Sequence, residues 1–273
     1  MCPAEIVRRN ATRLPGVPHN VTEGSRLTFV GHSTVLIELD GVRLLTDPVL
    51  RNRVGPLRRQ TGTVDPALYS SIDAALISHP HWDHLDVPSL RKLGPKTTLV
   101  VPAGTRRALQ LRRIRNVEEL KPGDSIDLGP LRVTATAANH EIVPNLLARD
   151  ADAMGFLIEG SRTLYFAGDT DLFPEMTDLA VGLDVALLPV WGWGPILGPG
   201  HLDPGRAAEA LRLLRPRVAV PIHWGTLAPI GLKLVRGDDW LHHPPREFRR
   251  HAARVAPEVD VRVVRPGGST GLA

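Results

Sequence analysis

A single short stretch, residues 78–86, decides how this sequence is interpreted. It reads Ser78-His79-Pro80-His81-Trp82-Asp83-His84-Leu85-Asp86. The apolar run Ala74–Ser78 leads into it and predicts a buried strand. Neutral imidazole and carboxylate groups are the usual ligands of zinc and neighbouring metals. An extended segment turns His79 and His81 to one side, whereas Asp83 and His84 follow in the turn and can face a second position. The motif therefore predicts one loop that serves two adjacent metal ions.

Three further candidate ligands follow other apolar runs within two or three residues. They are His140 after residues 131–138, Asp169 after residues 163–167 and His223 after residues 218–222. Strand ends in layered folds line up at one edge, where the loops carry function. We therefore expect these three side chains to join the 78–86 motif in one site.

Short β-branched or leucine-rich runs recur along the chain and predict strands. They cover residues 27–30, 34–39, 42–45, 74–78, 98–101, 131–137, 163–167, 185–188 and 218–222. Helices are expected at residues 105–115 and 246–255, and at Arg206–Leu214, which Asp203 can cap with Pro204 at the first position. Two strand-rich halves with interspersed helices indicate an α/β sandwich of sheets covered by helices.

Length and composition predict one large globular domain. The chain has 273 residues, of which 42% are hydrophobic and 23% charged, and its one cysteine excludes an internal disulfide scaffold. Residues 1–25 are expected to form an irregular leader, and residues 26–273 a single domain. The longest charge-free stretch, residues 185–200, holds four Gly and three Pro, and a membrane-spanning helix needs about 20 apolar residues. With no apolar signal-peptide core at the start, we expect a cytoplasmic protein without membrane insertion.

The net charge of +4 comes from 33 basic and 29 acidic residues. Most of the basic residues are arginine, which reflects either a GC-rich genome or an anion-binding surface. Residues 51–63 form a basic loop whose arginines either bind phosphate or are solvated. The arginine-rich segment 105–115 lacks interleaved aromatic residues for base stacking. We therefore expect no stable nucleic-acid partner; the oligomeric state stays open.

Taken together, the motifs resemble the metallo-β-lactamase superfamily, over roughly residues 26 to 270. They are residues 31–38, 45–48, 78–86, 166–170, 201–204 and 222–226. Within the superfamily they are most similar to the branch that contains ascorbate-6-phosphate lactonase and N-acyl-phosphatidylethanolamine-hydrolysing phospholipase D. The resemblance implies a four-layer αββα sandwich with one or two metal ions at one edge.

The resemblance also implies a role for each candidate ligand. His79, His81 and His140 would hold one metal ion. Asp83, His84 and His223 would hold the other, with Asp169 bridging the two. Zinc is the first candidate for both ions, and manganese or iron are the alternatives. Two such ions lower the pKa of a water molecule and activate it for attack on phosphorus or a carbonyl carbon. Asp83 and Asp169 would thus be catalytic through the metals, and no Ser or Cys nucleophile is required.

Five other residues each have two possible roles, one in the site and one structural. By resemblance Asp47 braces the ligand loop, or it is a turn residue before a proline. His201 either donates a proton or stabilises the oxyanion, or it is structural. His32 either hydrogen-bonds near the site or is structural. Trp191 and Trp193 either wall the pocket or pack on the sheet.

Three functions follow from this site. The first is metal-dependent hydrolysis of a phosphodiester or a phosphorylated small molecule, with a small anionic substrate. The second is a lactonase or another acyl hydrolase, which differs only in the shape of the pocket. A nuclease or nucleic-acid binder comes third, because the ligand spacing is compact and leaves little room for an extra domain. A redox role is disfavoured, because the related di-iron oxidases have Glu at the position of His81.

Overall fold

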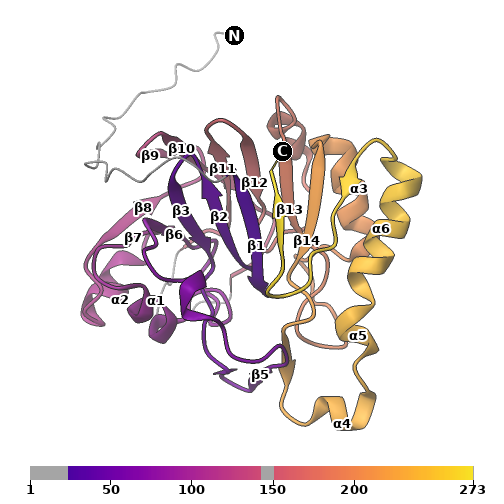
Figure 1. The fold of residues 1–273 in the computed structure, drawn as a ribbon, viewed down its shortest axis with the longest axis horizontal. Helices are drawn as coiled ribbons and strands as arrows, with labels where there is room; N and C mark the ends of the chain where they lie inside the picture. The colour runs from indigo at the N-terminus through magenta and orange to yellow at the C-terminus, as the bar shows by residue number, and fades with distance from the viewer. Residues whose placement is uncertain (1–23, 143–150, 273) are drawn as a thin grey trace.

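Two seven-stranded sheets stacked face to face form the centre of the protein (Figure 1). The structure is a computed structural model that describes residues 24–142 and 151–272, so all but the last two residues of the expected leader lie outside the described residues. In the first sheet the strands lie in the order β17 (Ser269–Gly271), β1 (Arg26–Gly31), β2 (Thr34–Leu39), β3 (Val42–Thr46), β6 (Ala74–Leu76), β7 (Thr98–Pro102) and β8 (Val117–Leu120).

The second sheet has a similar plan, with parallel strands at one end and antiparallel strands at the other. Its order is β16 (Asp260–Val261), β14 (Val218–Ile222), β13 (Val185–Pro189), β12 (Thr163–Phe166), β11 (Met154–Glu159), β10 (Leu131–Ala137) and β9 (Ser125–Leu128). The strands from β12 to β16 pair in parallel, and those from β9 to β12 pair antiparallel. Nine of the strands are those that the apolar runs predict, with ends shifted by at most two residues.

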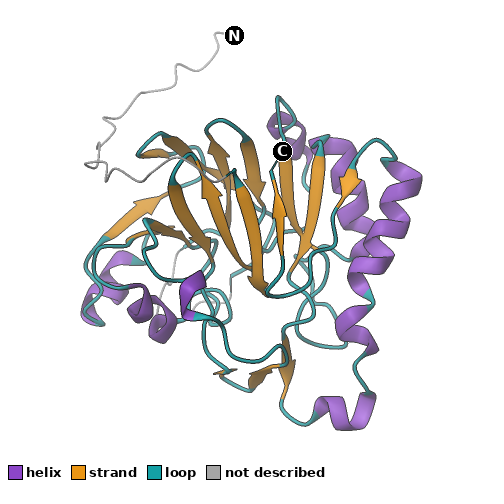
Figure 2. Ribbon diagram, in the orientation of Figure 1, coloured by secondary structure: helices purple, strands orange, loops and turns teal. Residues whose placement is uncertain are grey.

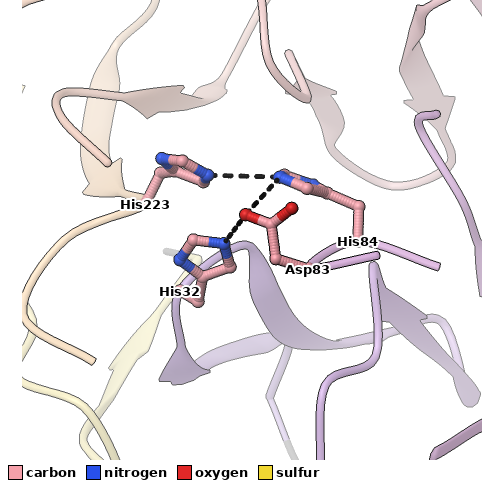
Figure 3. Close-up of side chains that lie close together, drawn as sticks. All are labelled: His32, Asp83, His84 and His223. Atoms are coloured by element: carbon pink, nitrogen blue, oxygen red, sulfur yellow. Dashed lines mark hydrogen bonds and ion pairs between the residues drawn. The ribbon is translucent and has the colours of Figure 1, made fainter. Parts of the chain in front are cut away.

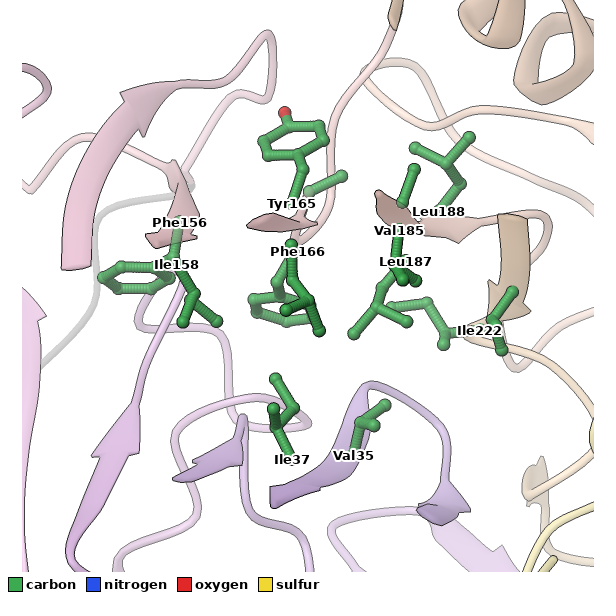
Figure 4. Packing of buried hydrophobic residues seen from close by; sticks show 14 of the residues in the cluster. Val35, Ile37, Phe156, Ile158, Tyr165, Phe166, Val185, Leu187, Leu188 and Ile222 are labelled. Carbon is green, nitrogen blue, oxygen red and sulfur yellow. The ribbon is translucent and has the colours of Figure 1, made fainter. Parts of the chain in front are cut away.

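The main core lies between the two sheets. Val35 and Ile37 of β2 point across the gap toward Phe166 of β12 and Leu187 of β13, while the neighbouring Tyr165 points to the opposite side of its strand (Figure 4). All five side chains are buried. This alternation is what a strand buried on both faces requires, and it explains why these runs are apolar without interruption.

Helices cover the outer faces of both sheets (Figure 2). On the first sheet, α1 (Val87–Leu93) and α2 (Arg106–Leu111) pack against a second apolar cluster that includes Leu99 of β7. On the other side of the molecule, α3 (Pro204–Leu214) packs against α6 (Pro244–Val255) and the second sheet. The expected αββα sandwich is therefore confirmed. Among the described residues, no helix is both long and apolar enough to cross a membrane.

The remaining short elements lie around the sandwich. They are the 3₁₀ turns η1 (Pro66–Leu68) and η2 (Pro174–Leu179), the helices α4 (Leu232–Arg236) and α5 (Asp239–His242), and a small sheet of β15 (Leu227–Pro229), β5 (Leu57–Arg59) and β4 (Arg53–Val54).

The small sheet corrects the expectation of a plain basic loop at residues 51–63. Val54 and Leu57 are buried and form a third apolar cluster with Leu227, which folds the segment into a hairpin. Arg59 is also buried, and its guanidinium donates hydrogen bonds to the backbone carbonyls of Val49 and Val30. This arginine is therefore a structural residue rather than a solvated one.

The expected helix at residues 105–115 is shorter than its pattern predicts. It ends at Leu111, because Arg112 leaves the helical conformation and Arg113 adopts a left-handed one with φ of 65°. Helix α1 was not expected, although its first turn has a recognisable start: Asp86 accepts a hydrogen bond from the Ser89 backbone, and a proline stands in the first turn.

We expect Leu187→Ala to destabilise the protein by roughly 2–5 kcal/mol, since it removes a fully buried side chain from between the sheets. The matched control is Leu111→Ala on α2, whose side chain is 77% exposed, and it should change stability by no more than about 0.5 kcal/mol. Urea unfolding followed by circular dichroism measures both. Equal stability losses would contradict the assignment of the core.

Candidate metal centre

All seven predicted ligands meet at one edge of the sandwich, because the strands that precede them run in the same direction within each sheet. His79 to His84 follow β6 of the first sheet. In the second sheet, His140 follows β10, Asp169 follows β12 and His223 follows β14. The structure brings them together with two further predicted residues, His32 after β1 and Asp47 after β3.

Three imidazoles form the first cluster. The Nδ1 atom of His81 lies 2.9 Å from Nε2 of His79 and 3.2 Å from Nε2 of His140. The three nitrogens face one another at distances that suit ligands around a common cation. This set could hold one metal ion.

A second cluster lies beside the first (Figure 3). Nε2 of His84 lies 3.2 Å from Nε2 of His223 and 3.7 Å from Oδ2 of Asp83. The same carboxylate oxygen lies 3.1 Å from Nε2 of His32. All four side chains are buried. This set could hold another metal ion, with His32 keeping the Asp83 carboxylate in place.

Asp169 lies between the two clusters. Its Oδ2 is 3.1 Å from Nε2 of His84 and 3.9 Å from Nε2 of His79, and its Oδ1 is 3.3 Å from Nε2 of His223. Oδ1 is buried and has no hydrogen-bond partner among the described residues. A buried carboxylate oxygen without a partner is costly, so this atom fits the position of a metal ligand.

Hydrogen bonds on the far side of the rings set the tautomers. Nδ1 of His84 donates to Asp47 at 2.7 Å, Nδ1 of His223 donates to the Trp191 carbonyl at 2.6 Å, and Nδ1 of His140 donates to the Gly200 carbonyl at 2.8 Å. With the proton on Nδ1, the lone pair of each neutral ring is on Nε2 and points into the site. Facing lone pairs repel unless a proton or a metal ion lies between them. The donor set therefore fits metal ions.

Electrostatics favours the ligand form of most of these groups at neutral pH. Burial holds the pKa of His79 well below its usual value, and burial with neighbouring imidazoles lowers the pKa of His81 to about 4. Burial lowers the pKa of His223 to about 3. His84 differs: burial opposes its charged form, yet the carboxylates around it, Asp169 first, raise its pKa well above the usual value.

Asp47 ties the end of β3 to the ligand loop. Its carboxylate accepts hydrogen bonds from the backbone N–H of Ser78 at 2.7 Å and the Ser78 hydroxyl at 2.6 Å, in addition to the one from His84. Nδ1 of His79 lies 2.9 Å from the same hydroxyl. Ser78 therefore links Asp47 to a second imidazole, a contact that the sequence did not indicate.

His201 reaches the site from the loop before α3. Its Nδ1 donates to the Pro199 carbonyl at 2.9 Å, and its Nε2 lies 3.3 Å from Oδ2 of Asp169. Burial opposes the charged ring, but the hydrogen bond to Asp169 raises the pKa of His201 above its usual value. The side chain is 21% exposed, compared with 3% for Asp169 and 2% for His223, and it borders a cavity.

That cavity has a volume of about 500 Å³ and opens onto the ligand edge. Its lining consists of His81, Trp82, Asp83, Asp169, Gly192, Trp193, Gly194, Ile196, Leu197, Gly198, His201 and His223. Of the two tryptophans expected in its wall, Trp193 lines it. The indole of Trp191 borders a neighbouring cavity instead, and its carbonyl orients His223. None of the arginines of residues 51–63 lines the cavity.

Comparison with known proteins gives the class. The sequence profile of the beta-lactamase superfamily domain matches residues 42–224, and the chain belongs to this family. It is a metal-dependent hydrolase of the metallo-β-lactamase fold.

Individual relatives agree with this class. The chain is 32% identical over 252 residues to a metal-dependent hydrolase of Methanopyrus kandleri, covering 89% of this chain and 98% of the relative. It is 30% identical to an N-acyl-phosphatidylethanolamine-hydrolyzing phospholipase D of Caenorhabditis elegans, covering 78% and 69% of the two chains. A metallo hydrolase of Ignicoccus hospitalis has a similar structure, with a TM-score of 0.70, 26% identity and coverage of 91% and 98%.

We expect zinc binding to the metal-free protein at pH 7 to release at least one proton. The carboxylates around His84 raise its pKa and favour its charged ring in the metal-free protein, and a metal ion that takes its Nε2 displaces that proton. His81 and His223 contribute none, because their lowered pKa values leave them neutral. Calorimetric titration in buffers of different ionisation enthalpy counts the protons, and His84→Asn should release about one fewer. Binding without proton release would contradict the charge assigned to His84.

Proposed function

We propose that this protein hydrolyses small phosphodiesters with a dinuclear metal centre. The observation that best supports the proposal is the position of Asp169, whose carboxylate lies 3.1 and 3.3 Å from His84 and His223 of the second cluster and 3.9 Å from His79 of the first. In this proposal His79, His81 and His140 hold one ion; Asp83, His84 and His223 hold the other; and Asp169 serves both.

The nitrogen-rich ligand set favours zinc, and manganese or iron would fit the same types of side chain. When bound, the two ions would lower the pKa of a water molecule and stabilise negative charge on the group that is attacked. The chain itself has to orient the ligands and supply a proton to the leaving oxygen.

His201 is the candidate for that proton. It borders the cavity, and its hydrogen bond to Asp169 favours the charged ring. Since Nδ1 is held by backbone carbonyls, Nε2 is the atom from which a proton can leave. A histidine in this position would act as a general acid or stabilise the developing oxyanion.

The cavity supports a small substrate. About 500 Å³ lies within the range of small-molecule pockets. The substrate would bring its negative charge to the metal-facing side of the cavity. A lactone or another carboxylic ester is the second candidate, because among the described residues no lysine or arginine lines the cavity that would demand a second charged group.

We expect the purified protein to bind up to two divalent ions per chain and to hydrolyse bis(p-nitrophenyl) phosphate in a metal-dependent way. Asp169→Ala should lose the most metal, since this carboxylate lies near both clusters. Loss of a group that only hydrogen-bonds a ligand already costs roughly 10–100-fold in metal affinity, and loss of a ligand should cost at least that. Metal content by mass spectrometry and hydrolysis before and after chelation measure this. Full activity after complete removal of metal would refute the proposal. A panel that also holds lactones, carboxylic esters, phosphomonoesters, β-lactams and RNA tests the alternatives.

We expect His201→Ala to reduce kcat by about 100-fold or more, with KM changed much less, because a proton donor acts in the transition state. Its metal content should stay near that of the unchanged protein. His223→Ala should instead lose metal, and His251→Ala on α6 serves as a surface control for both. An active His201→Ala enzyme would make His201 structural, and a metal-depleted one would make it a ligand.

A further inference from the structure

Part of the cavity lining is apolar, beside the metal-ligating residues. Trp82 comes from the ligand loop and Trp193 from the loop after β13, and their ring centroids lie 6.0 Å apart with an angle of 44° between the planes. Ile196 and Leu197 continue this side of the lining. Trp82 is 38% exposed and Ile196 is 84% exposed. Apolar groups that face a cavity in this way are available to a ligand.

The aromatic pair is held in place by its surroundings. Trp193 packs against the apolar cluster of Val49, Val54, Leu57 and Leu227 beneath it. The ring of Trp82 lies over Gly55 in the turn between β4 and β5, where an added Cβ would be 3.4 Å from the ring. The indole nitrogen of Trp191 donates to the Gly194 carbonyl at 2.8 Å, which closes the loop that carries Trp193. These contacts preform a surface for a flat ring.

Two of the arginines near this wall are engaged by other groups. Arg51 forms a two-pronged pair with Asp86, with N–O distances of 2.8 and 2.5 Å. Arg59 is buried and donates to backbone carbonyls. Among the described residues, no lysine or arginine lines the cavity, and the one lining residue whose charged form is favoured, His201, already contacts Asp169. A second negative charge placed against the apolar wall would therefore lose part of its hydration without gaining a lysine or arginine partner from these residues.

We propose that the wall formed by Trp82, Trp193, Ile196 and Leu197 is an aryl-binding subsite, so that the substrate carries a compact, uncharged aromatic group next to the reacting centre. This rests on the proposed function for the identity of the reacting group. Among phosphodiesters and esters, this subsite would favour substrates with an aromatic substituent over sugar phosphates and other substrates with a second charge.

The test measures binding of three phosphonates by isothermal titration calorimetry, with and without added zinc. Methylphosphonate carries only the anionic head, benzylphosphonate adds the ring, and 4-carboxybenzylphosphonate adds a second charge to it. We expect benzylphosphonate to bind at least about tenfold more tightly than methylphosphonate, from burial of the ring. The carboxylated probe should lose most of that gain.

Variants of the wall locate the effect. Trp193→Ala should reduce the benzyl-to-methyl affinity ratio to about threefold or less, whereas Trp193→Phe should keep part of it, because the smaller ring still covers the wall. Trp240→Ala, at a tryptophan outside this cavity, is the control and should keep the full ratio.

The outcomes separate this subsite from the proposed function. A tenfold ratio that depends on Trp193, in a protein that hydrolyses no phosphodiester or ester, supports the subsite and refutes the proposed function. Equal affinities for the benzyl and methyl probes, in an active protein, refute the subsite alone. A ratio unchanged in Trp193→Ala also refutes it, since the ring would then bind elsewhere.

Discussion

The crowding of buried histidines and carboxylates at one sheet edge is the constraint on which the rest of the structure depends. His79, His84, His223, Asp47 and Asp169 are each at most 3% exposed, and unpaired burial of such groups is costly. Hydrogen bonds on the outer side of the cluster offset this cost. The atoms that point away from the site are hydrogen-bonded to Asp47, to Ser78 and to the carbonyls of Trp191 and Gly200. The ring nitrogens and carboxylate oxygens that point into the site face one another. The outer hydrogen bonds stabilise these buried groups when no metal ion is bound, and they also orient the groups to bind cations.

The backbone is strained at three of the residues on this edge. Asp47, His32 and His223 follow three different strands, and all have positive φ, at 31°, 57° and 63°. Side chains other than glycine rarely adopt this region, and each such residue costs of the order of 1 kcal/mol or more. The strain persists because the surrounding structure holds these residues in place. The backbone N–H of His223 donates to the His32 carbonyl at 2.8 Å, and that of His32 donates to the Thr226 hydroxyl at 2.8 Å. Close approach at Gly31 leaves no room for a Cβ, which would lie 2.7 Å from the Thr226 side chain. These sharp turns thus direct the imidazole rings of His32 and His223 into the site, whereas a regular strand end would direct them elsewhere.

Sequence alone predicts the parts of this protein that have a periodic or compositional signature. Uninterrupted apolar runs such as residues 163–167 and 218–222 mark strands buried on both faces, and the residues after them mark the edge. Contacts made by backbone atoms have no such signature. That the Trp191 carbonyl, rather than its indole, serves His223 follows from the course of the loop, and the same holds for Gly200 and His140. The prediction that Arg59 belongs to a plain basic loop was wrong for a related reason. In the sequence it resembles its exposed arginine neighbours, but the alternation along β5 turns Arg59, like Leu57, to the buried face.

The chemistry and the choice of substrate depend largely on different parts of the chain. The metal-facing groups stand on strand ends that the two sheets fix, whereas Trp193, Ile196 and Leu197 of the aromatic wall stand on a loop, residues 191–198, which packs against the hairpin of residues 53–59. Trp82 of the wall comes from the ligand loop itself. Loops can vary without disturbing the sheets, so the wall could be remodelled while the ligands stay in place. The exception is the first part of the loop. The Trp191 carbonyl holds Nδ1 of His223, and an added Cβ at Gly192 would lie 3.8 Å from that ring. The end of the loop is also tied to the site, because the Gly198 carbonyl accepts a hydrogen bond from Nδ1 of His201 at 3.2 Å. Variation that reshapes the wall is therefore best tolerated between Trp193 and Leu197, whereas a change in backbone course at Trp191 would turn His223 and disturb the ligand set.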